Sequence, residues 1–104
     1  MAKHPQSLFG RRLRSARERA GLAQDRLGVL IGLDESCSSA RISRYETGVH
    51  EPPFDTAKRL AAALNVPVTY FYCPQEQMAM LLIELHNSSR EKIQAILQSV
   101  RADN

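Results

Sequence analysis

Five arginines fall within nine residues near the beginning of the chain: Arg11, Arg12, Arg14, Arg17 and Arg19. A guanidinium group is always charged and donates hydrogen bonds in a fixed plane, which suits it to phosphate and carboxylate oxygens. The whole chain has 14 Lys and Arg against 11 Asp and Glu, a formal net charge of +3. The excess is uneven, because residues 1–73 hold 11 basic and 7 acidic side chains whereas residues 74–104 hold 3 and 4. This asymmetry favours a polyanion partner for the first part, although a solvated helix face would give the same count.

The remaining reactive side chains lack the spacing that metal binding or catalysis requires. Cys37 and Cys73 are far apart, and His4, His50 and His86 are isolated, so no C-x-x-C or H-x-x-x-H pair supports zinc. The chain also has no G-x-x-x-x-G-K-S/T phosphate loop, no G-x-S-x-G motif and no convincing carboxylate pair. We therefore expect no metal, no cofactor, no disulfide and no enzymatic activity.

The length limits the fold to one domain with a short appendage. The chain has 104 residues, of which 43% are hydrophobic, and no apolar run approaches the roughly 18–20 residues that span a membrane. Met1–Gln6 lacks the apolar stretch of a signal peptide. We therefore expect a soluble, cytoplasmic protein with no membrane contact.

Helical spacing of apolar residues recurs along the first 73 residues, and alternating strand patterns are nearly absent. Ser7 is a candidate N-cap, followed by an apolar stripe of Phe9, Leu13, Ala16 and Ala20. Gly21, Gly32, Gly48 and Asn65 are expected to end helices, and Pro52–Pro53 to separate them. A loop is expected at 33–37, with Ser38 or Ser39 as the N-cap that follows it. The predicted helices cover residues 8–20, 24–31, 40–47 and 55–64, with a brief helical turn at 68–72.

Two further apolar stripes occupy the last 30 residues. Asn87–Ser89 separates them, and Ser88 with Glu91 forms a capping-box pattern. The sequence thus predicts an all-α protein, with a compact five-helix domain over 1–73 and a two-helix hairpin over 74–104. Each hairpin helix must bury its stripe against the first domain or against another subunit. The stripes consist of Met78, Leu81, Leu82 and Leu85, and of Ile93, Ile96, Leu97 and Val100.

Three ordered segments resemble the Xre family of lambda-repressor-like, Cro-type helix-turn-helix DNA-binding domains. They are Leu22–Gly28 (LAQDRLG), Ile42–Gly48 (ISRYETG) and, after Pro52, Leu60–Pro67 (LAAALNVP). The likeness covers roughly residues 7–72. It implies a helix-turn-helix in which the third helix enters the major groove, a space that admits one α-helix.

The resemblance also implies roles for individual residues. Arg44 is the one side chain on the outer face of the third helix that could bind guanine through two hydrogen bonds. The amide of Gln24, at the beginning of the second helix, could bind phosphate with help from the helix dipole. The competing interpretation is that these polar side chains are only solvated. The expected base contacts are Ser39, Ala40, Ser43 and Arg44, the expected phosphate contacts are Gln24, Ser38, Arg41 and Thr47, and Arg17 with Glu46 would form a structural ion pair.

Two features depart from the family pattern. Ala23 stands where relatives place a serine or threonine cap, which weakens that helix end by about 1 kcal/mol. The turn before the third helix is also longer than usual, and Asp34–Cys37 brings two carboxylates beside a surface meant for phosphates. We expect this loop to bend away from DNA, because the charges repel. The alternative is that it extends the recognition helix backwards, where Glu35 could accept a hydrogen bond from cytosine.

These features predict a sequence-specific DNA-binding transcriptional regulator, a repressor that binds a roughly palindromic operator as a homodimer. The hairpin would pair the subunits and hold two recognition helices about 34 Å apart on double-stranded DNA. The alternative is a protein-interaction module, such as the DNA-binding antitoxin of a toxin–antitoxin pair, whose hairpin binds a different protein.

Overall fold

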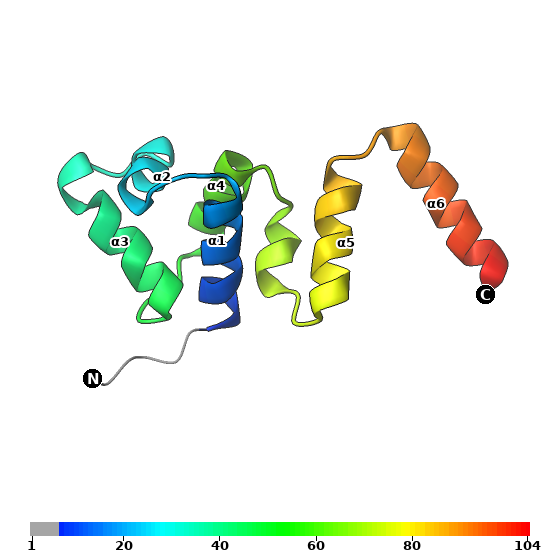
Figure 1. The fold of residues 1–104 in the computed structure, drawn as a ribbon, viewed down its shortest axis with the longest axis horizontal. Coiled ribbons are helices and arrows are strands. Elements are labelled where there is room, and N and C mark those ends of the chain that lie inside the picture. The colour runs from blue at the N-terminus through cyan, green and yellow to red at the C-terminus, as the bar shows by residue number, and fades with distance from the viewer. Residues whose placement is uncertain (1–6) are drawn as a thin grey trace.

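A computed structural model describes residues 7–104, and these residues form helices with no strand among them (Figure 1). The all-α prediction is therefore confirmed, and the expectation about Met1–Gln6 concerns residues outside the described part. None of the helices in residues 7–104 is long and apolar enough to cross a membrane. The elements are α1 (Leu8–Arg19), α2 (Gln24–Leu30), α3 (Glu35–Thr47), α4 (Phe54–Leu64), the 3-10 helix η1 (Val68–Tyr72), α5 (Glu76–His86) and α6 (Arg90–Asp103).

Helix α1 is central to the core and lies between the α2–α3 pair and η1 (Figure 1). Its predicted stripe is buried at Phe9, Leu13 and Ala16, whereas Ala20 is exposed beyond the last turn. The ring of Phe9 packs on that of Phe71 from η1, with centroids 4.8 Å apart. Aromatic rings bury large apolar areas, so this contact ties the beginning of α1 to the end of the five-helix unit.

Most helix ends follow the sequence signals. The Ser7 hydroxyl accepts a hydrogen bond from the Gly10 amide at 2.9 Å, which makes Ser7 the N-cap of α1. Gly48 (φ 84°) and Asn65 (φ 57°) adopt the left-handed conformation after α3 and α4, and each ends its helix as predicted. The inward face of α4 is also as predicted: Ala57, Leu60, Ala61 and Leu64.

The beginning of α3 differs from the prediction. The helix begins at Glu35 rather than Ala40, and its N-cap is Asp34 rather than Ser38 or Ser39. The Asp34 carboxylate accepts hydrogen bonds from the Ser36 amide at 2.9 Å and the Ser36 hydroxyl at 2.6 Å. The hydroxyl bond is the main reason why the pKa of Asp34 lies below its usual range. Residues 35–37 thus form the first turn of α3. The prediction that they form a loop bending away from DNA is therefore wrong.

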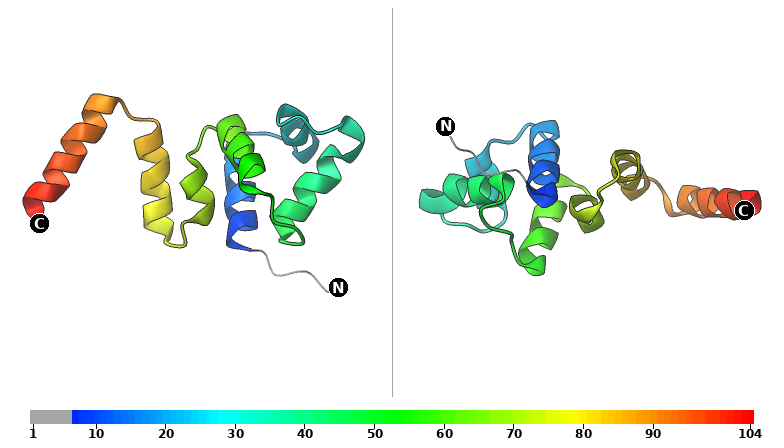
Figure 2. Two further views of the ribbon diagram at one scale, coloured as in Figure 1. Left: turned by 180° about the vertical axis from the view of Figure 1, so that it is seen from behind. Right: turned by 90° about the horizontal axis from the view of Figure 1, so that it is seen from below.

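The last two helices do not form a closed hairpin. Helix α5 packs on η1 through Ala79, which is fully buried, while the predicted stripe residues Met78 and Leu81 are about half exposed. Helix α6 extends away at the end opposite α3, and none of its residues is buried (Figures 1 and 2). Its N-cap is Ser89, which accepts from the Lys92 amide at 3.1 Å, rather than the predicted Ser88. We call α5 and α6 together the arm.

Candidate nucleic-acid interface

Helices α2 and α3 approach each other closely at Gly28 and Ser38. The Ser38 hydroxyl donates to the Asp25 carbonyl at 2.5 Å, and a Cβ placed on Gly28 would lie only 1.9 Å from that hydroxyl oxygen. Ser38 is fully buried by this contact. The expected phosphate contact of Ser38 is therefore wrong, because its hydroxyl faces the core and is already bonded. Ser38 instead holds α3 rigidly against α2.

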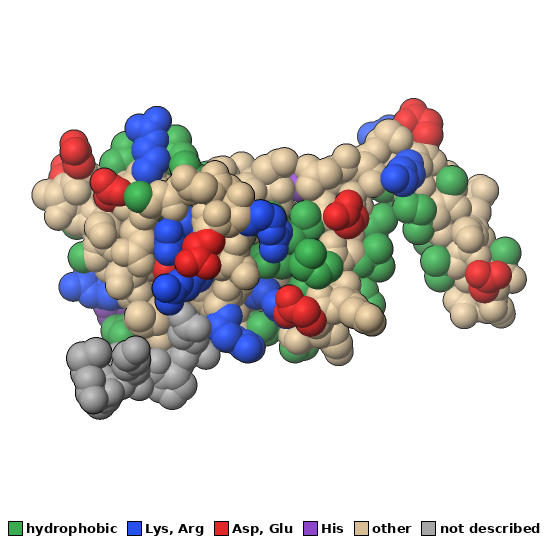
Figure 3. All heavy atoms as spheres, in the orientation of Figure 1, with side chains coloured by type: hydrophobic (Ala, Val, Ile, Leu, Met, Phe, Trp, Pro, Cys, Tyr) green, Lys and Arg blue, Asp and Glu red, His purple; other side chains and the backbone are tan. Residues whose placement is uncertain are grey.

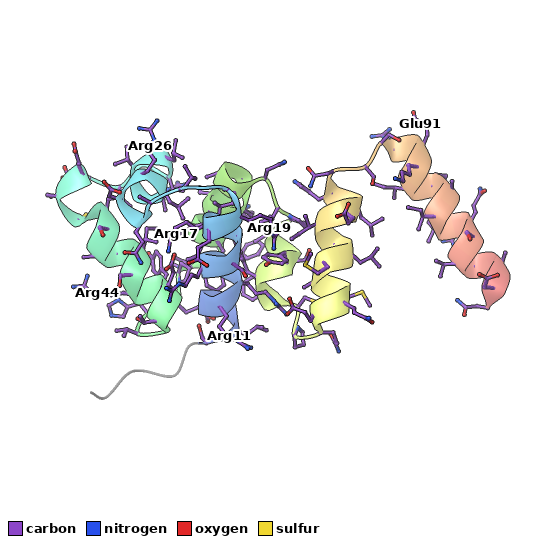
Figure 4. All side chains as sticks on the ribbon, viewed as in Figure 1. Arg11, Arg17, Arg19, Arg26, Arg44 and Glu91 are labelled. Carbon is purple, nitrogen blue, oxygen red and sulfur yellow. The ribbon has the colours of Figure 1, made fainter. Side chains whose placement is uncertain are left out.

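The opposite face of α3 is exposed among residues 7–104. The helix buries Ser38, Ile42, Tyr45 and Glu46, and it lies at the end of the molecule (Figure 1). Figure 4 shows that Arg44 points away from the body of the protein. A polar face with small side chains lets a helix come close to base edges and phosphates. The residues on or beside it are Ser36, Ser39, Ala40, Arg41 and Arg44, which are exposed, and Ser43 and Thr47, which are half-buried.

Ser36 is absent from the sequence-predicted contact set. It joins the outer face only because α3 begins at Glu35, so that Ser36 lies one helical turn before Ala40. The signal that could have found it is Asp34 followed by Glu35, since Asp is a strong N-cap and an acidic first turn favours the helix dipole. Ser38 and Ser39 obscured that signal, because they are equally good caps.

A buried ion pair joins α1 to α3 behind the exposed face. Arg17 donates to the Glu46 carboxylate from Nε at 2.5 Å and from Nη2 at 3.1 Å, and from Nη1 to the Leu22 carbonyl at 2.9 Å. The Glu46 side chain is only 3% exposed. Its hydrogen bond with Arg17 is the main reason why the pKa of Arg17 lies above its usual range. The structure thus brings the predicted pair together and satisfies both charges.

Gln24 links this ion pair to the exposed face. Its Nε2 donates to Glu46 Oε1 at 3.1 Å, and its Oε1 accepts from the Ser39 hydroxyl at 3.4 Å. Gln24 is half-buried at the first residue of α2, so its amide is held in place from both sides. The side-chain amide carries two N–H donors, and only one of them has a partner among residues 7–104. The structure therefore places Gln24 and Ser39, from two helices, side by side at one polar surface.

The arginines near the beginning of the chain do not form one basic patch. Arg12 is buried, Arg17 belongs to the ion pair with Glu46, and Arg14 pairs with Glu18 at 3.4 Å. Figure 4 shows Arg26 on α2 and Arg44 on α3 pointing outward at the α2–α3 end of the molecule. Arg26, which is exposed in the first turn of α2, is not among the predicted contact residues. The outward-pointing cations that Figure 4 labels at this end therefore come from α2 and α3.

Among residues 7–104, no group of three or more His, Cys, Asp or Glu side chains gathers in a way that could hold a metal ion. Both cysteines are free. The chemistry that the α2–α3 surface can perform is recognition, through amide, hydroxyl and guanidinium donors on rigid helices.

Comparisons with known proteins agree with this geometry. A family model described as a helix-turn-helix domain matches residues 8–69. The chain is also similar to the crystal structure of the transcriptional regulator BswR, with 38% sequence identity and a TM-score of 0.85, over 89% of this chain and 92% of that one. No curated protein matches the chain. The chain therefore belongs to the helix-turn-helix family, as its Xre-like signature predicts, and is a DNA-binding protein rather than an enzyme.

Proposed function

We propose that this protein is a sequence-specific transcriptional repressor that binds a roughly palindromic operator as a homodimer. The observation that carries the proposal is the polar face of α3, which residues 7–104 leave exposed and which Ser38 and Glu46 hold in place from behind. The similarity to a transcriptional regulator supports a role in regulation. A chromosomal DNA partner agrees with the cytoplasmic location that the sequence predicts.

Phosphate and base contacts would come from different parts of the surface. Gln24, Arg41 and Thr47 lie around the rim of the α3 face and would bind phosphates, which fixes the register of the protein on the duplex. Ser36, in the first turn, would join the base-reading residues, since the N-terminal part of a recognition helix contacts base edges. The base-reading residues would be Ser36, Ser39, Ala40, Ser43 and Arg44.

The arm would supply the dimer interface. Its apolar side chains remain exposed: Met78 by 51%, Leu97 by 40% and Val100 by 53%. Figure 3 shows hydrophobic side chains along both α5 and α6, at the end of the molecule opposite α3. Apolar surface of this extent is more stable when covered, and a second copy of the arm carries the same surface. The proposed interface residues are Met78, Leu81, Leu82, Leu85, Ile93, Ile96, Leu97 and Val100.

The decisive experiment is selection of bound DNA from a random pool, followed by affinity measurements at two salt concentrations. We expect a palindromic site, and we expect Arg44→Ala to cost roughly 1–3 kcal/mol and to relax the preference at one base pair. Arg90→Ala, which removes the same charge from the first turn of α6, is the matched control. A uniform loss over all sequences, with a smaller salt dependence, would instead make Arg44 a phosphate contact.

The exposed arm also fits the second candidate function, in which a different protein covers it, as in an antitoxin bound to its toxin. The two candidates predict different masses in solution. A homodimer at micromolar concentration in the purified protein supports the repressor proposal. A monomer that remains monomeric on its selected DNA, together with a second protein that co-purifies in fixed stoichiometry, would favour the antitoxin.

A further inference from the structure

We propose that Arg12 is a positioning residue that fixes the direction of α5 relative to the recognition helix, and so sets the half-site spacing that the dimer accepts. The inference rests on the proposed homodimer, since spacing has a meaning only when two recognition helices bind one operator. It assigns a role to a side chain that lies outside the α2–α3 surface.

The guanidinium of Arg12 bonds to three residues at the connection into α5. It donates to the Cys73 carbonyl from Nε at 3.1 Å and from Nη2 at 2.8 Å, and more weakly to the Pro74 carbonyl at 3.5 Å. Its Nη1 donates to Glu76 Oε2 at 2.6 Å, at the first residue of α5. One side chain of α1 therefore holds the exit of η1 and the beginning of α5 at once.

The burial of Arg12 lets this contact fix the orientation of the connection. The Arg12 side chain is only 8% exposed, whereas Glu76 is 75% exposed. An ion pair with one exposed partner contributes little through charge alone, but a buried guanidinium must keep its hydrogen bonds. Because the guanidinium is planar, its N–H groups can reach all of these acceptors only when the connection has one orientation. Arg12 also lowers the pKa of Glu76, mainly through this hydrogen bond.

The far end of α5 has a second anchor. Asn65, in the left-handed turn after α4, donates from its side-chain amide to the Asn87 Oδ1 at 2.9 Å. Between the two anchors, Ala79 is fully buried against the five-helix unit. Helix α5 is thus fixed at both ends and in the middle. Its outer stripe, which would meet the partner subunit, therefore points in one direction relative to α3.

Spacing selectivity follows from this rigidity. Each added base pair moves one half-site by roughly 3.4 Å and turns it by about 35° around the DNA axis. A stiff dimer binds only the spacer that presents both half-sites to its two recognition helices. A dimer with loosely attached arms would accept several spacers and would gain less from the second half-site.

The test is a set of operators that carry the selected half-sites with central spacers changed by one and two base pairs. We expect the wild-type protein to prefer one spacer by roughly tenfold or more, and Arg12→Met to reduce that preference to about threefold or less. Binding to a single half-site should remain within roughly twofold, because the α2–α3 surface is unchanged. Arg14→Met is the matched control, since Arg14 is exposed on the same helix and bonds only to Glu18 among residues 7–104.

Glu76→Ala keeps the test decisive if Arg12→Met does not fold. It removes one anchor at an exposed position and should give an intermediate preference. Residual dipolar couplings of the backbone amides would report, without DNA, whether the angle between α1 and α5 becomes variable in either variant. A folded, dimeric Arg12→Met protein, or failing that Glu76→Ala, with the spacer preference of the wild type would overturn the inference. A wild-type dimer without any spacer preference would overturn this inference and leave the dimer proposal standing, whereas a wild-type protein that binds the operator as a monomer would overturn the dimer proposal and this inference with it.

Discussion

Glu35 puts a carboxylate on the helix that would enter the major groove. It is exposed in the first turn of α3, where a negative charge stabilises the helix through its dipole but repels DNA phosphates. We expect Glu35→Gln to raise the affinity for all duplexes roughly two- to fivefold at low salt, or about 0.4–1 kcal/mol. Fluorescence anisotropy with the selected site and a scrambled duplex would measure it.

The control for this variant is Glu84→Gln, which removes the same charge from an exposed position on α5. It should leave both affinities unchanged at moderate salt, because surface charges more than about 10 Å away are screened. If Glu35→Gln instead loses preference at one base pair, Glu35 accepts from a cytosine amino group and reads sequence directly.

Glu46 is the second residue whose charge can be tested alone. Glu46→Gln keeps an oxygen for Gln24 but leaves the Arg17 guanidinium, 12% exposed, without its counter-charge. Removing one partner of a buried pair is costly, so we expect the free energy of unfolding in urea to fall by about 2–4 kcal/mol. Glu18→Gln breaks the exposed pair with Arg14 and should change it by less than about 0.5 kcal/mol. Equal losses in the two variants would mean that the Arg17–Glu46 pair contributes no more than a surface contact.

At the scale of elements, α2 has a defect that can be repaired. Its N-cap residue Ala23 has the extended backbone of a cap (φ −74°, ψ 158°) but makes no side-chain hydrogen bond to the first turn. Ala23→Ser should supply one and raise the free energy of unfolding by about 1 kcal/mol. Urea denaturation measures the change, and Ala20→Ser at the exposed C-cap of α1 is the control that should gain nothing. No gain in Ala23→Ser would show that the turn before α2 cannot orient a hydroxyl.

The sequence predicts those elements whose signals are local. Helix α4 has four inward residues at helical spacing and an asparagine exit, and both its bounds and its buried face agree with the structure to within one residue. The predicted beginning of α3 is wrong because Asp34, Ser38 and Ser39 are all good N-caps, and the choice among them depends on tertiary packing. Ser38 is buried only because Gly28, ten residues earlier, leaves room for its hydroxyl. No periodicity within α3 contains that information.

The site was predictable where the family signature fixes a partner, as for Arg17 and Glu46. Arg12 was not, because its acceptors lie more than 60 residues away along the chain and two of them are backbone carbonyls. A backbone carbonyl has no sequence signature. The contact between the side chains of Gln24 and Ser39 was not predictable for a different reason, because it depends on the angle between α2 and α3.

At the scale of the whole molecule, the chain is extended, with principal dimensions of 51 × 28 × 23 Å. The arm accounts for the long dimension, because α6 lies beyond α5 at the end opposite α3 (Figure 2). Two functions are thus separated in space. One end presents the polar face of α3, and the other presents apolar side chains that the monomer leaves uncovered.

This separation predicts a variant that loses assembly alone. Leu97→Asp puts a charge in the proposed interface, and we expect sedimentation equilibrium to show a monomer at micromolar concentration. Affinity for the palindrome should fall at least roughly tenfold because the second half-site no longer helps, while single half-site binding is kept. Gln98→Asp, on the opposite face of the same helix, should remain dimeric. A Leu97→Asp protein that is still dimeric would place the interface elsewhere.

Helix α6 has 14 residues and none of them is buried. An isolated helix of that length is marginally stable in water, because nucleation is costly and no packed face repays it. Under the proposed assembly, the energy of subunit contact must therefore also maintain the secondary structure of the last segment. Folding of α6 and association become one event whose extent depends on how much protein is present. Repression would then begin over a narrow range of intracellular abundance, so that the amount of the regulator is itself a signal to which the operator responds.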